Sequence, residues 1–563
     1  MLPALSTSSP ARCRLTWPAG YVACAAVAVC GFAAAGALLA VTLPYHQWDS
    51  FGFGTWSEAI ARHGKVDPAF PGAQLASRPL FYELQGLVWW ITGVSFAAGR
   101  LLSLGFALVL LGSVFRLARG LTGSRLHGAV AVTAMLAVPV FAQQALSGQT
   151  DVPVAAMVAL AAALTLRPLR GRLGVAALVL AAAAAVLTKQ TALLALAPLA
   201  AALLVVPVRQ LEARLRGPAG ALVAGLALGV AYDVVMAERF HAGLVSFLET
   251  GTGGIWAQFA AQTRSDAVLR ADVLGAGLRL PLTFSLLYAA TRLAGLRHRF
   301  AVVLALTAGL AWCIAGPLAA GVPNGAFAQP EDGFTLIGFA VVLAAGALLA
   351  DEDAPSRRTL LYGLALGLPP LVAWVTSATY TDRLAAPAWP GFAVLIAAVV
   401  VAGVRGLARS GTMLALAPLP IVAMALWMSL ASLDGLHGSM WTEYRSLGLS
   451  GLGDKARTMH VVLPVVQSTL AIVESQLTDG RVVTGDPMIP WFLPGRVDTR
   501  TPGRCADLRG EQVFVLLTGN ESLLEAREQG RLATPAQWAA CTSPKLRQLS
   551  DGGNGYAVFA IGR

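Results

Sequence analysis

Long apolar stretches recur along the first three quarters of the chain, separated by short polar segments. A stretch of about 20 apolar residues is long enough for a helix to cross a lipid bilayer. The pattern predicts a mainly α-helical, polytopic membrane protein with about 13 transmembrane helices within residues 1–432. The expected spans lie near 20–43, 99–118, 126–143, 150–166, 173–189, 191–208, 218–236, 280–295, 300–320, 334–350, 358–378, 384–404 and 411–432.

The composition agrees with this pattern. Of the 563 residues, 56% are hydrophobic and 13% are charged, and the mean hydropathy is +0.66. A soluble protein carries about 25% charged residues. The first apolar stretch follows Arg12 and Arg14, and no clear small-residue cleavage site comes after it. We therefore expect an uncleaved first span rather than a signal peptide.

Most basic residues lie in short loops between the predicted spans, and this placement bears on topology and partners. Arginine clusters occur at 116–125, 167–172, 209–216, 297–299, 357–358 and 405–409. Short loops rich in Lys and Arg usually stay in the cytoplasm, so we expect a cytoplasmic N-terminus and, after an odd number of spans, an external C-terminus in an inner or plasma membrane. The net charge of +11 is then a topology signal, and no nucleic-acid partner is expected.

Three regions are expected outside the membrane: residues 44–98, residues 237–279 and the tail 433–563. In the first, LFYELQGLVWWITG (80–93) is too short and too polar to span, and it predicts an interfacial helix with Trp89 and Trp90 at the level of the lipid headgroups. The second region either closes over a ligand or is a structured connector.

The tail is expected to form a small α/β domain. Its sequence predicts an amphipathic helix at 456–477, strands at 481–485, 512–519 and 556–562, and a helix at 522–530. Cys505 and Cys541 both lie in this polar segment, in a compartment expected to be oxidising. A disulfide between them is one interpretation, and two unpaired thiols in a small core are the other.

Two acidic residues are candidates for chemistry. Asp49 stands in LPYHQWDSFGFGTW (43–56), directly after the first span, where a carboxylate among aromatic residues could accept a proton from an incoming hydroxyl. Asp151 opens a later span that is expected to begin at the same membrane face. Each has a structural alternative, because Asp49 or Ser50, and Thr150 with Asp151, could cap the helix that follows.

Two basic residues are candidates for holding an anion. Arg78 stands immediately before the predicted interfacial helix, where its guanidinium could bind a lipid phosphate, or could simply extend to the membrane interface. Lys189 in AVLTKQTAL is either a second phosphate ligand or a boundary between two spans. The histidines and cysteines show no metal-ligand spacing and no nucleophile elbow is present, so a divalent metal is possible but not required.

These motifs resemble the N-terminal half of the GT-C fold glycosyltransferases, over roughly residues 20–210. The resemblance is carried by WDS (48–50), SEAIARHG (57–64), SRPLFYELQGLVWWITG (77–93), GRLLSLGFALVLLGSVFRLARGLTG (99–123), ALSGQTDVPVAA (145–156) and LTKQTALLALAPLAAALL (187–204). The sequence is most similar to aminoarabinose transferases and protein O-mannosyltransferases, and weaker similarities follow at 381–395 and 482–496.

The resemblance implies a polyprenyl-phosphate sugar donor, an acceptor outside the cytoplasm, inversion at the anomeric carbon, and an acidic residue in the first external loop, which matches Asp49. The family often has Asp-Glu where Asp49-Ser50 stands and Lys-Pro-Pro where Arg78 stands. Whether Asp151 or Glu58 replaces the missing glutamate stays open. Further residues that could line the pocket are Trp48, Glu58, Tyr82 and Arg383.

The sequence thus predicts an integral-membrane glycosyltransferase acting on a cell-envelope glycan, lipid or protein. Two alternatives are a multi-span transporter or lipid flippase and an inactive scaffold of envelope assembly. The charges gather at one predicted face rather than at the midplane, which favours the enzyme over a transporter.

Overall fold

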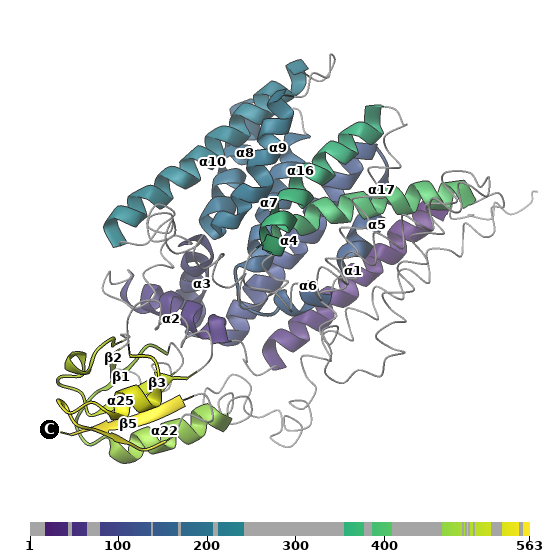
Figure 1. Cartoon of the computed structure of the whole chain (residues 1–563). Coiled ribbons are helices and arrows are strands. Elements are labelled where there is room, and N and C mark those ends of the chain that lie inside the picture. The colour runs from purple at the N-terminus through teal and green to yellow at the C-terminus, as the bar shows by residue number, and fades with distance from the viewer. Residues whose placement is uncertain are drawn as a thin grey trace, which may run out of the picture.

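The structure is a computed structural model, in which a bundle of helices is joined to a small sheet domain at its C-terminal end (Figure 1). It describes residues 17–42, 48–64, 79–136, 139–166, 171–205, 212–240, 354–376, 386–407, 464–486, 489, 493, 496–498, 502–518, 532–550 and 556–562.

The bundle contains helices of very different lengths. They are α1 (Trp17–Thr42), α2 (Trp48–His63), α3 (Pro79–Thr92), α4 (Phe96–Thr122), α5 (Arg125–Leu136), α6 (Pro139–Gln144), α7 (Asp151–Thr165), α8 (Gly171–Thr188), the 3-10 turn η2 (Gln190–Ala192), α9 (Leu193–Val205), α10 (Glu212–Phe240), α16 (Ala354–Thr376) and α17 (Trp389–Leu407). Within the described residues, the segments long and apolar enough to cross a membrane are Ala19–Val41, Phe96–Thr122, Gly171–Thr188 and Gly217–Val235. The chain is a multi-pass membrane protein.

The count of 13 spans stays a prediction, because 280–295, 300–320, 334–350 and 411–432 lie outside the described residues. One predicted span differs from the structure. The stretch 126–143 forms two helices, α5 and α6, and α6 begins at Pro139. A proline lacks the amide hydrogen that a continuous helix needs there, so a new helix starts at that residue.

Helix ends and helix contacts follow from local sequence. Ser95 caps α4 by accepting a hydrogen bond from the Ala98 amide at 3.4 Å, and Gly123 ends the helix with φ 72°, a conformation that favours glycine. Between α8 and α10, a Cβ placed on Gly229 would be 2.7 Å from the Cβ of Val186. Small residues therefore let these helices pack closely, as is common in lipid.

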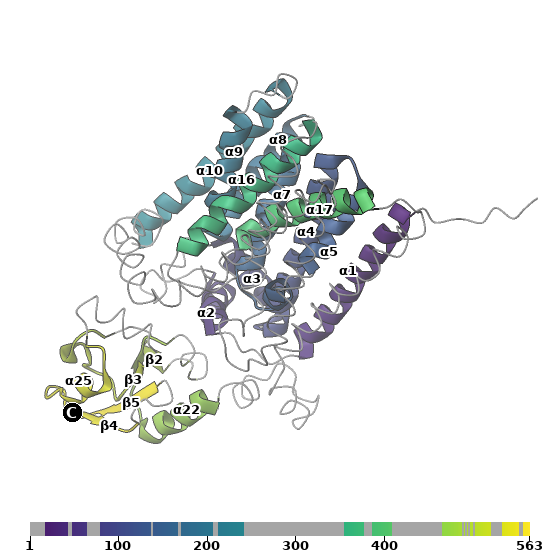
Figure 2. The same ribbon diagram turned by 45° about the vertical axis from the view of Figure 1, so that its right-hand side comes forward.

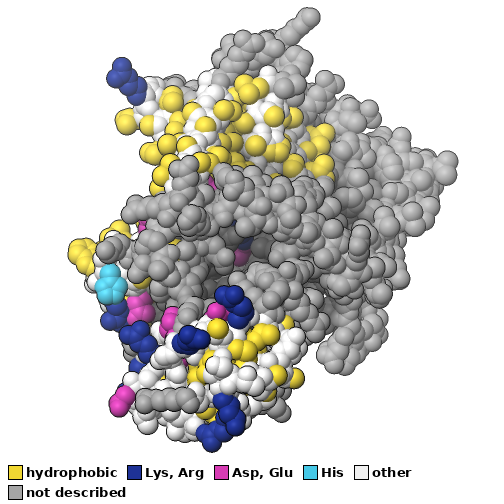
Figure 3. Space-filling view, turned by 60° about the vertical axis from the view of Figure 1, so that its left-hand side comes forward, with side chains coloured by type: hydrophobic (Ala, Val, Ile, Leu, Met, Phe, Trp, Pro, Cys, Tyr) yellow, Lys and Arg dark blue, Asp and Glu magenta, His cyan; other side chains and the backbone are white. Residues whose placement is uncertain are grey.

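Helices α2 and α3 lie between the bundle and the sheet domain in both ribbon views (Figures 1 and 2). We call this end of the bundle the α3 end. The arginines that end α4 and begin α5 and α8, namely Arg119, Arg125 and Arg172, belong to the opposite end. Figure 3 shows apolar side chains over the helical part and most of the visible charged side chains over the lower part of the molecule. This separation is typical of a membrane domain with a solvent-facing cap.

The C-terminal part is a five-stranded mixed sheet in the order β2-β1-β3-β5-β4. Its elements are α22 (Pro464–Gln476), β1 (Val482–Thr484), β2 (Val497–Asp498), the 3-10 turn η4 (Cys505–Asp507), β3 (Val513–Leu517), α25 (Pro535–Ala539), β4 (Leu546–Gln548) and β5 (Tyr556–Ile561). Strand β1 is parallel to β2 and β3, and β5 is antiparallel to β3 and β4. The expected strands at 481–485, 512–519 and 556–562 are confirmed, whereas β2, β4 and α25 were not predicted, and the expected helix at 522–530 lies outside the described residues.

Alternate residues of the strands bury opposite faces of the sheet. Val513 and Val515 of β3 share a core with α22 and with Trp89 and Phe96 of the bundle. Phe514, between them, packs in a second core on the other face with Trp538 and Phe559. Because side chains alternate along a strand, both faces of β3 are apolar and buried. The sheet therefore packs directly against α3 and the start of α4.

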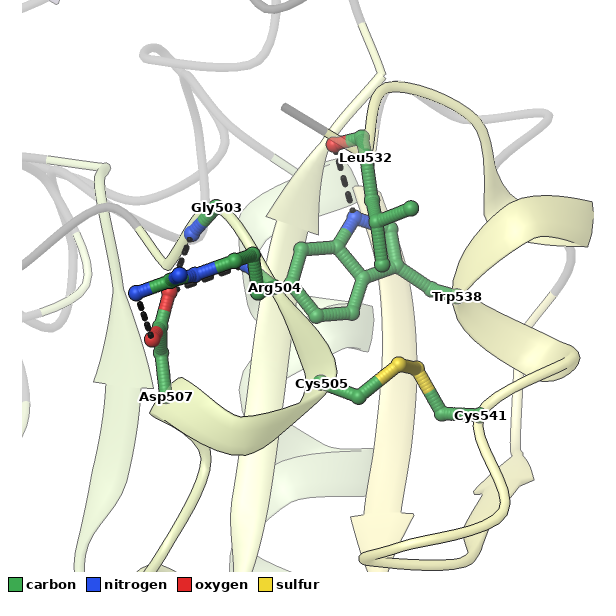
Figure 4. Close-up of a disulfide and its surroundings, with 7 residues drawn as sticks. All are labelled: Gly503, Arg504, Cys505, Asp507, Leu532, Trp538 and Cys541. Carbon is green, nitrogen blue, oxygen red and sulfur yellow. Dashed lines mark hydrogen bonds and ion pairs between the residues drawn. A yellow bond between two sulfur atoms is a disulfide. The ribbon is translucent and has the colours of Figure 1, made fainter. Parts of the chain in front are cut away.

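A disulfide joins Cys505 and Cys541, as one of the two interpretations of the sequence expected (Figure 4). It closes a segment of 36 residues and links η4 to the end of α25. Nearby, the Asp507 carboxylate accepts from the amide of Arg504 at 2.9 Å, and the Trp538 indole donates to the Leu532 carbonyl at 3.1 Å. These contacts order the second face of the sheet.

The predicted helix at 80–93 is α3, but its two tryptophans differ. Trp89 has an exposed fraction of only 1% and packs edge-on against Phe96, with ring centroids 6.3 Å apart. Trp90 is 70% exposed. The expectation that both lie at the headgroup level is wrong for Trp89, because the sheet domain covers that side of the helix.

Candidate active site

Helices α2 and α3 run in the same direction along each other. The rings of Trp56 and Tyr82 lie 6.4 Å apart, and a Cβ on Gly86 would be 2.8 Å from Cγ2 of Ile60. Tyr82 lies 26 positions after Trp56 and Gly86 lies 26 positions after Ile60, while the contacts of Ser57 with Gln85 and Gly86 have offsets of 28 and 29. Because the offset changes by only three positions, the two helices run in the same general direction where they touch.

This arrangement brings the start of α2 and the start of α3 to the same end of the helix pair. Asp49 is the second residue of α2, and Pro79, which directly follows Arg78 in the sequence, is the first residue of α3. With a rise of 1.5 Å per residue and packed helix axes 8–10 Å apart, the backbones of Asp49 and Pro79 are separated by on the order of 10 Å. Asp49 lies inside the first turn rather than at the capping position, and Arg78 lies outside the described residues.

Asp151 and Lys189 form a buried ion pair. The Lys189 ammonium lies 2.5 Å from Oδ1 of Asp151, and the two residues are 5% and 3% exposed. Asp151 begins α7 and Lys189 follows the last residue of α8, so the pair joins two helix ends that are 38 residues apart. Thr150, the residue before α7, makes no side-chain capping hydrogen bond. The helix-boundary interpretation of Lys189 also holds, because η2 begins at the next residue.

A second buried carboxylate lies beside this pair and was missed by sequence analysis. The side-chain amide of Gln190 donates to Oδ1 of Asp233 at 3.2 Å, and Asp233, on α10, is buried. Lys189 and Gln190 are adjacent, so the break between α8 and α9 is bonded to α7 on one side and to α10 on the other. An acidic residue inside the span 218–236 was the signal that could have indicated it.

Arg100 is a second residue that the sequence analysis did not single out. It is buried on α4, and its Nη1 donates to the carbonyl of Ala40 at 3.3 Å. Ala40 lies in the last turn of α1, where backbone carbonyls lack partners within the helix. A cation at this position is favoured by the helix dipole. It ties the last turn of α1 to α4, at a point nine residues before Asp49 in the sequence.

The remaining candidates are spread more widely. Glu58 pairs with Arg62 one helical turn later on α2, at 2.7 Å, and Tyr82 is fully buried in α3. Trp48 begins α2. Arg383 lies outside the described residues, as do residues 241–279 of the region 237–279 that is expected to be external. Within the residues that the structure describes, no group of three or more His, Cys, Asp or Glu side chains is placed to hold a metal ion.

The arrangement of helices matches solved structures of known proteins. A crystal structure of ArnT from Cupriavidus metallidurans bound to undecaprenyl phosphate has a TM-score of 0.52, with 14% sequence identity, over 95% of this chain and 97% of that chain. The chain has the GT-C fold. The apo state of the same ArnT gives a TM-score of 0.50 at 14% identity, again over 95% and 97% of the two chains.

The GT-C resemblance is confirmed by a second finding. Residues 77–235 match the family model described as dolichyl-phosphate-mannose-protein mannosyltransferase. This segment contains α3 to α9 and most of α10, and therefore both members of the Asp151–Lys189 pair. No curated protein is a significant match to the sequence.

Proposed function

We propose that this GT-C protein is a glycosyltransferase that moves a hexose or pentose from a polyprenyl-phosphate donor to a hydroxyl group outside the cytoplasm. The acceptor is a cell-envelope glycan, a lipid or a protein. The fold supports this proposal, because ArnT, which shares it, was solved with undecaprenyl phosphate bound. The match of residues 77–235 to a family named for a lipid-phosphate-sugar enzyme supports it independently.

The observation that carries the proposal is the parallel packing of α2 and α3. It supports a site in which Asp49, at the start of one helix, and Arg78, next to the start of the other, face the same substrate. A separation on the order of 10 Å leaves room for a phosphosugar between a carboxylate and a guanidinium. Arg78 in place of the family's lysine retains the positive charge and adds bidentate geometry for phosphate.

In the proposed reaction, the Asp49 carboxylate removes the proton from the acceptor hydroxyl. The acceptor oxygen then bonds to the anomeric carbon as the bond from that carbon to the phosphate oxygen breaks, with inversion. The bonding electrons leave with the polyprenyl phosphate, whose developing charge is stabilised by Arg78. The proton on Asp49 returns to water, and no metal ion is needed for this balance.

We assign the Asp151–Lys189 pair to the donor side of the same site. Helix α3 packs against both α4 and α8, and Lys189 directly follows α8. Lys189 contributes positive charge toward the donor phosphate, and Asp151 holds the ammonium in place and balances its charge when no donor is bound. This role predicts that Lys189 affects donor binding, whereas Asp49 affects the transfer step.

Donor binding is testable without knowing the sugar. Native mass spectrometry of the protein in nanodiscs with undecaprenyl phosphate should show a specific complex. Arg78→Ala should weaken it at least tenfold, since a hydrogen bond to a charged group contributes about 1.5–3 kcal/mol. The matched control is Arg172→Ala, because Arg172 is exposed at the opposite end of the bundle. Equal binding by all three proteins would refute the role of Arg78.

The transporter and scaffold alternatives are separated by the transfer step. Membranes are taken from cells that produce the protein, and mass spectrometry measures how much polyprenyl-phosphate-linked hexose and pentose is lost over time. We call this measurement the donor-consumption assay. An enzyme consumes these lipids and stops when Asp49 is replaced by Asn. A flippase or a scaffold leaves the total amount of lipid-linked sugar unchanged in wild type and variant alike.

A further inference from the structure

A fully buried glutamine lies where α2, α3 and α4 meet. The hydroxyl of Ser57 on α2 donates to Oε1 of Gln85 on α3 at 3.3 Å. On the other side, Gly99 of α4 leaves the space for the same side chain, since a Cβ there would be 2.6 Å from the Gln85 Nε2. Gln85 therefore connects both external helices to the first turn of a membrane-spanning helix.

Gly86, the next residue of α3, packs closely against α2. A Cβ at this position would lie 2.8 Å from Cγ2 and 2.9 Å from Cβ of Ile60, and 3.0 Å from the backbone carbonyl oxygen of Ser57. Contacts below 3.0 Å require one helix to move, because a backbone and a branched Cβ cannot yield as a flexible side chain can. Only glycine allows the observed spacing of α2 and α3.

We propose that Ser57, Gln85 and Gly86 are positioning residues that set the place of Asp49, at the start of α2, relative to the start of α3. They lie in the middle of α2, whose first turn contains the proposed base, and of α3, which begins directly after the proposed phosphate ligand in the sequence, and they fix how far one helix is advanced along the other. This inference rests on the proposed function. Its physical basis is that a misplacement of about 1 Å between reacting groups can lower a rate by about a hundredfold.

The decisive variant is Gly86→Ala, with Gly105→Ala as its matched control. A Cβ on Gly105 of α4 has no heavy atom within 4 Å, so this control adds the same methyl group without a clash. We expect Gly86→Ala to lower the rate in the donor-consumption assay at least tenfold per folded molecule. Binding of undecaprenyl phosphate should stay within about threefold of wild type, since single phosphate contacts remain available.

A rescue variant keeps the inference testable if Gly86→Ala folds poorly. Ile60→Gly combined with Gly86→Ala removes both Ile60 atoms that the new methyl group would meet, so that α2 and α3 can keep their spacing. The double variant should recover most of the lost rate, whereas Ile60→Gly alone should cost about 1 kcal/mol of helix stability. Gln85→Leu, which loses the hydrogen bond to Ser57, should reduce the rate in the same way as Gly86→Ala.

The outcomes separate this inference from the proposed function. If Asp49→Asn abolishes donor consumption but Gly86→Ala retains the wild-type rate per folded molecule, the positioning role is wrong and the enzyme assignment stands. If Gly86→Ala only lowers the melting temperature, the junction is structural. If it abolishes lipid binding, the junction is part of the binding site itself. If wild type consumes no donor, both proposals fail.

Discussion

Breaking the Asp151–Lys189 pair should cost far more stability than removing it. The two side chains are 4% and 6% exposed, so water and salt screen them little. Lys189→Met leaves a buried carboxylate without its cation, and Asp151→Leu leaves a buried ammonium. Each single change should destabilise the protein by about 3–5 kcal/mol, whereas the double change to two apolar residues should be close to neutral.

The assay is a double-mutant cycle on the free energy of unfolding in detergent. Unfolding is monitored by tryptophan fluorescence or by the folded fraction in size-exclusion chromatography. The control is the ion pair between Arg62 and Glu58, whose side chains are 59% and 17% exposed. Arg62→Met should cost no more than about 1 kcal/mol, as is usual for surface pairs. If the stability losses of Asp151→Leu and Lys189→Met sum to the loss of the double variant within about 0.5 kcal/mol, the two residues are not coupled. The ion pair would then contribute no interaction energy to stability.

Three further predictions test the sheet domain and its contact with the bundle. Trp89→Ala should destabilise the folded protein by about 3–5 kcal/mol and Trp90→Ala by about 0.5 kcal/mol or less in detergent, because the first is buried against Phe96 and the second is exposed; equal melting temperatures would contradict the docking of the sheet on α3. Cys505→Ser should cost about 4 kcal/mol, as expected for a cross-link that closes 36 residues, and unfolding of reduced and oxidised wild type at the same midpoint would contradict this. Burial, together with the neighbouring Asp486 carboxylate, raises the pKa of the Tyr556 phenol. The protonated Tyr556 phenol therefore contributes its full stability below pH about 10, the ordinary pKa of tyrosine, and this stability is lost as the pH rises above that value. Between pH about 9 and 11 the free energy of unfolding should fall less steeply with pH in Tyr556→Phe than in wild type. Identical slopes of the two proteins would refute the assignment.

Much of the bundle could be predicted from its apolar stretches. The expected spans 99–118, 150–166 and 173–189 correspond to α4, α7 and α8 within a few residues. Even the weakest division, at Thr188-Lys189-Gln190, is confirmed, because α8 ends at Thr188 and η2 begins at Gln190. Local hydrophobicity decides these elements, and local sequence contains that information.

The pairing of the site residues could not be predicted in this way. Asp151 and Lys189 meet across 38 residues, and Arg100 reaches Ala40 across 60. Both contacts depend on which helices are neighbours in the bundle, and a hydropathy pattern does not contain that information. The sequence pattern predicts charges at one face but does not indicate which of them are partners.

The parallel packing of α2 and α3 was also beyond sequence reasoning. Two consecutive helices usually form an antiparallel hairpin, whereas α2 and α3 run in the same general direction where they touch. The same limit applies to Trp89, which was expected at the membrane surface and is covered by a domain almost 400 residues later in the chain. Only tertiary structure shows such long-range contacts.

The most direct test of the account is the donor-consumption assay on Asp49→Asn, with Asp49→Glu and Glu58→Gln as controls. Wild type should consume a polyprenyl-phosphate-linked sugar. Asp49→Asn should bind undecaprenyl phosphate as wild type does and lose at least a hundredfold in rate, because general acid–base catalysis contributes about 10²–10⁴. Consumption by Asp49→Asn at the wild-type rate would contradict the assignment of the base, and no consumption by wild type would contradict the enzyme itself.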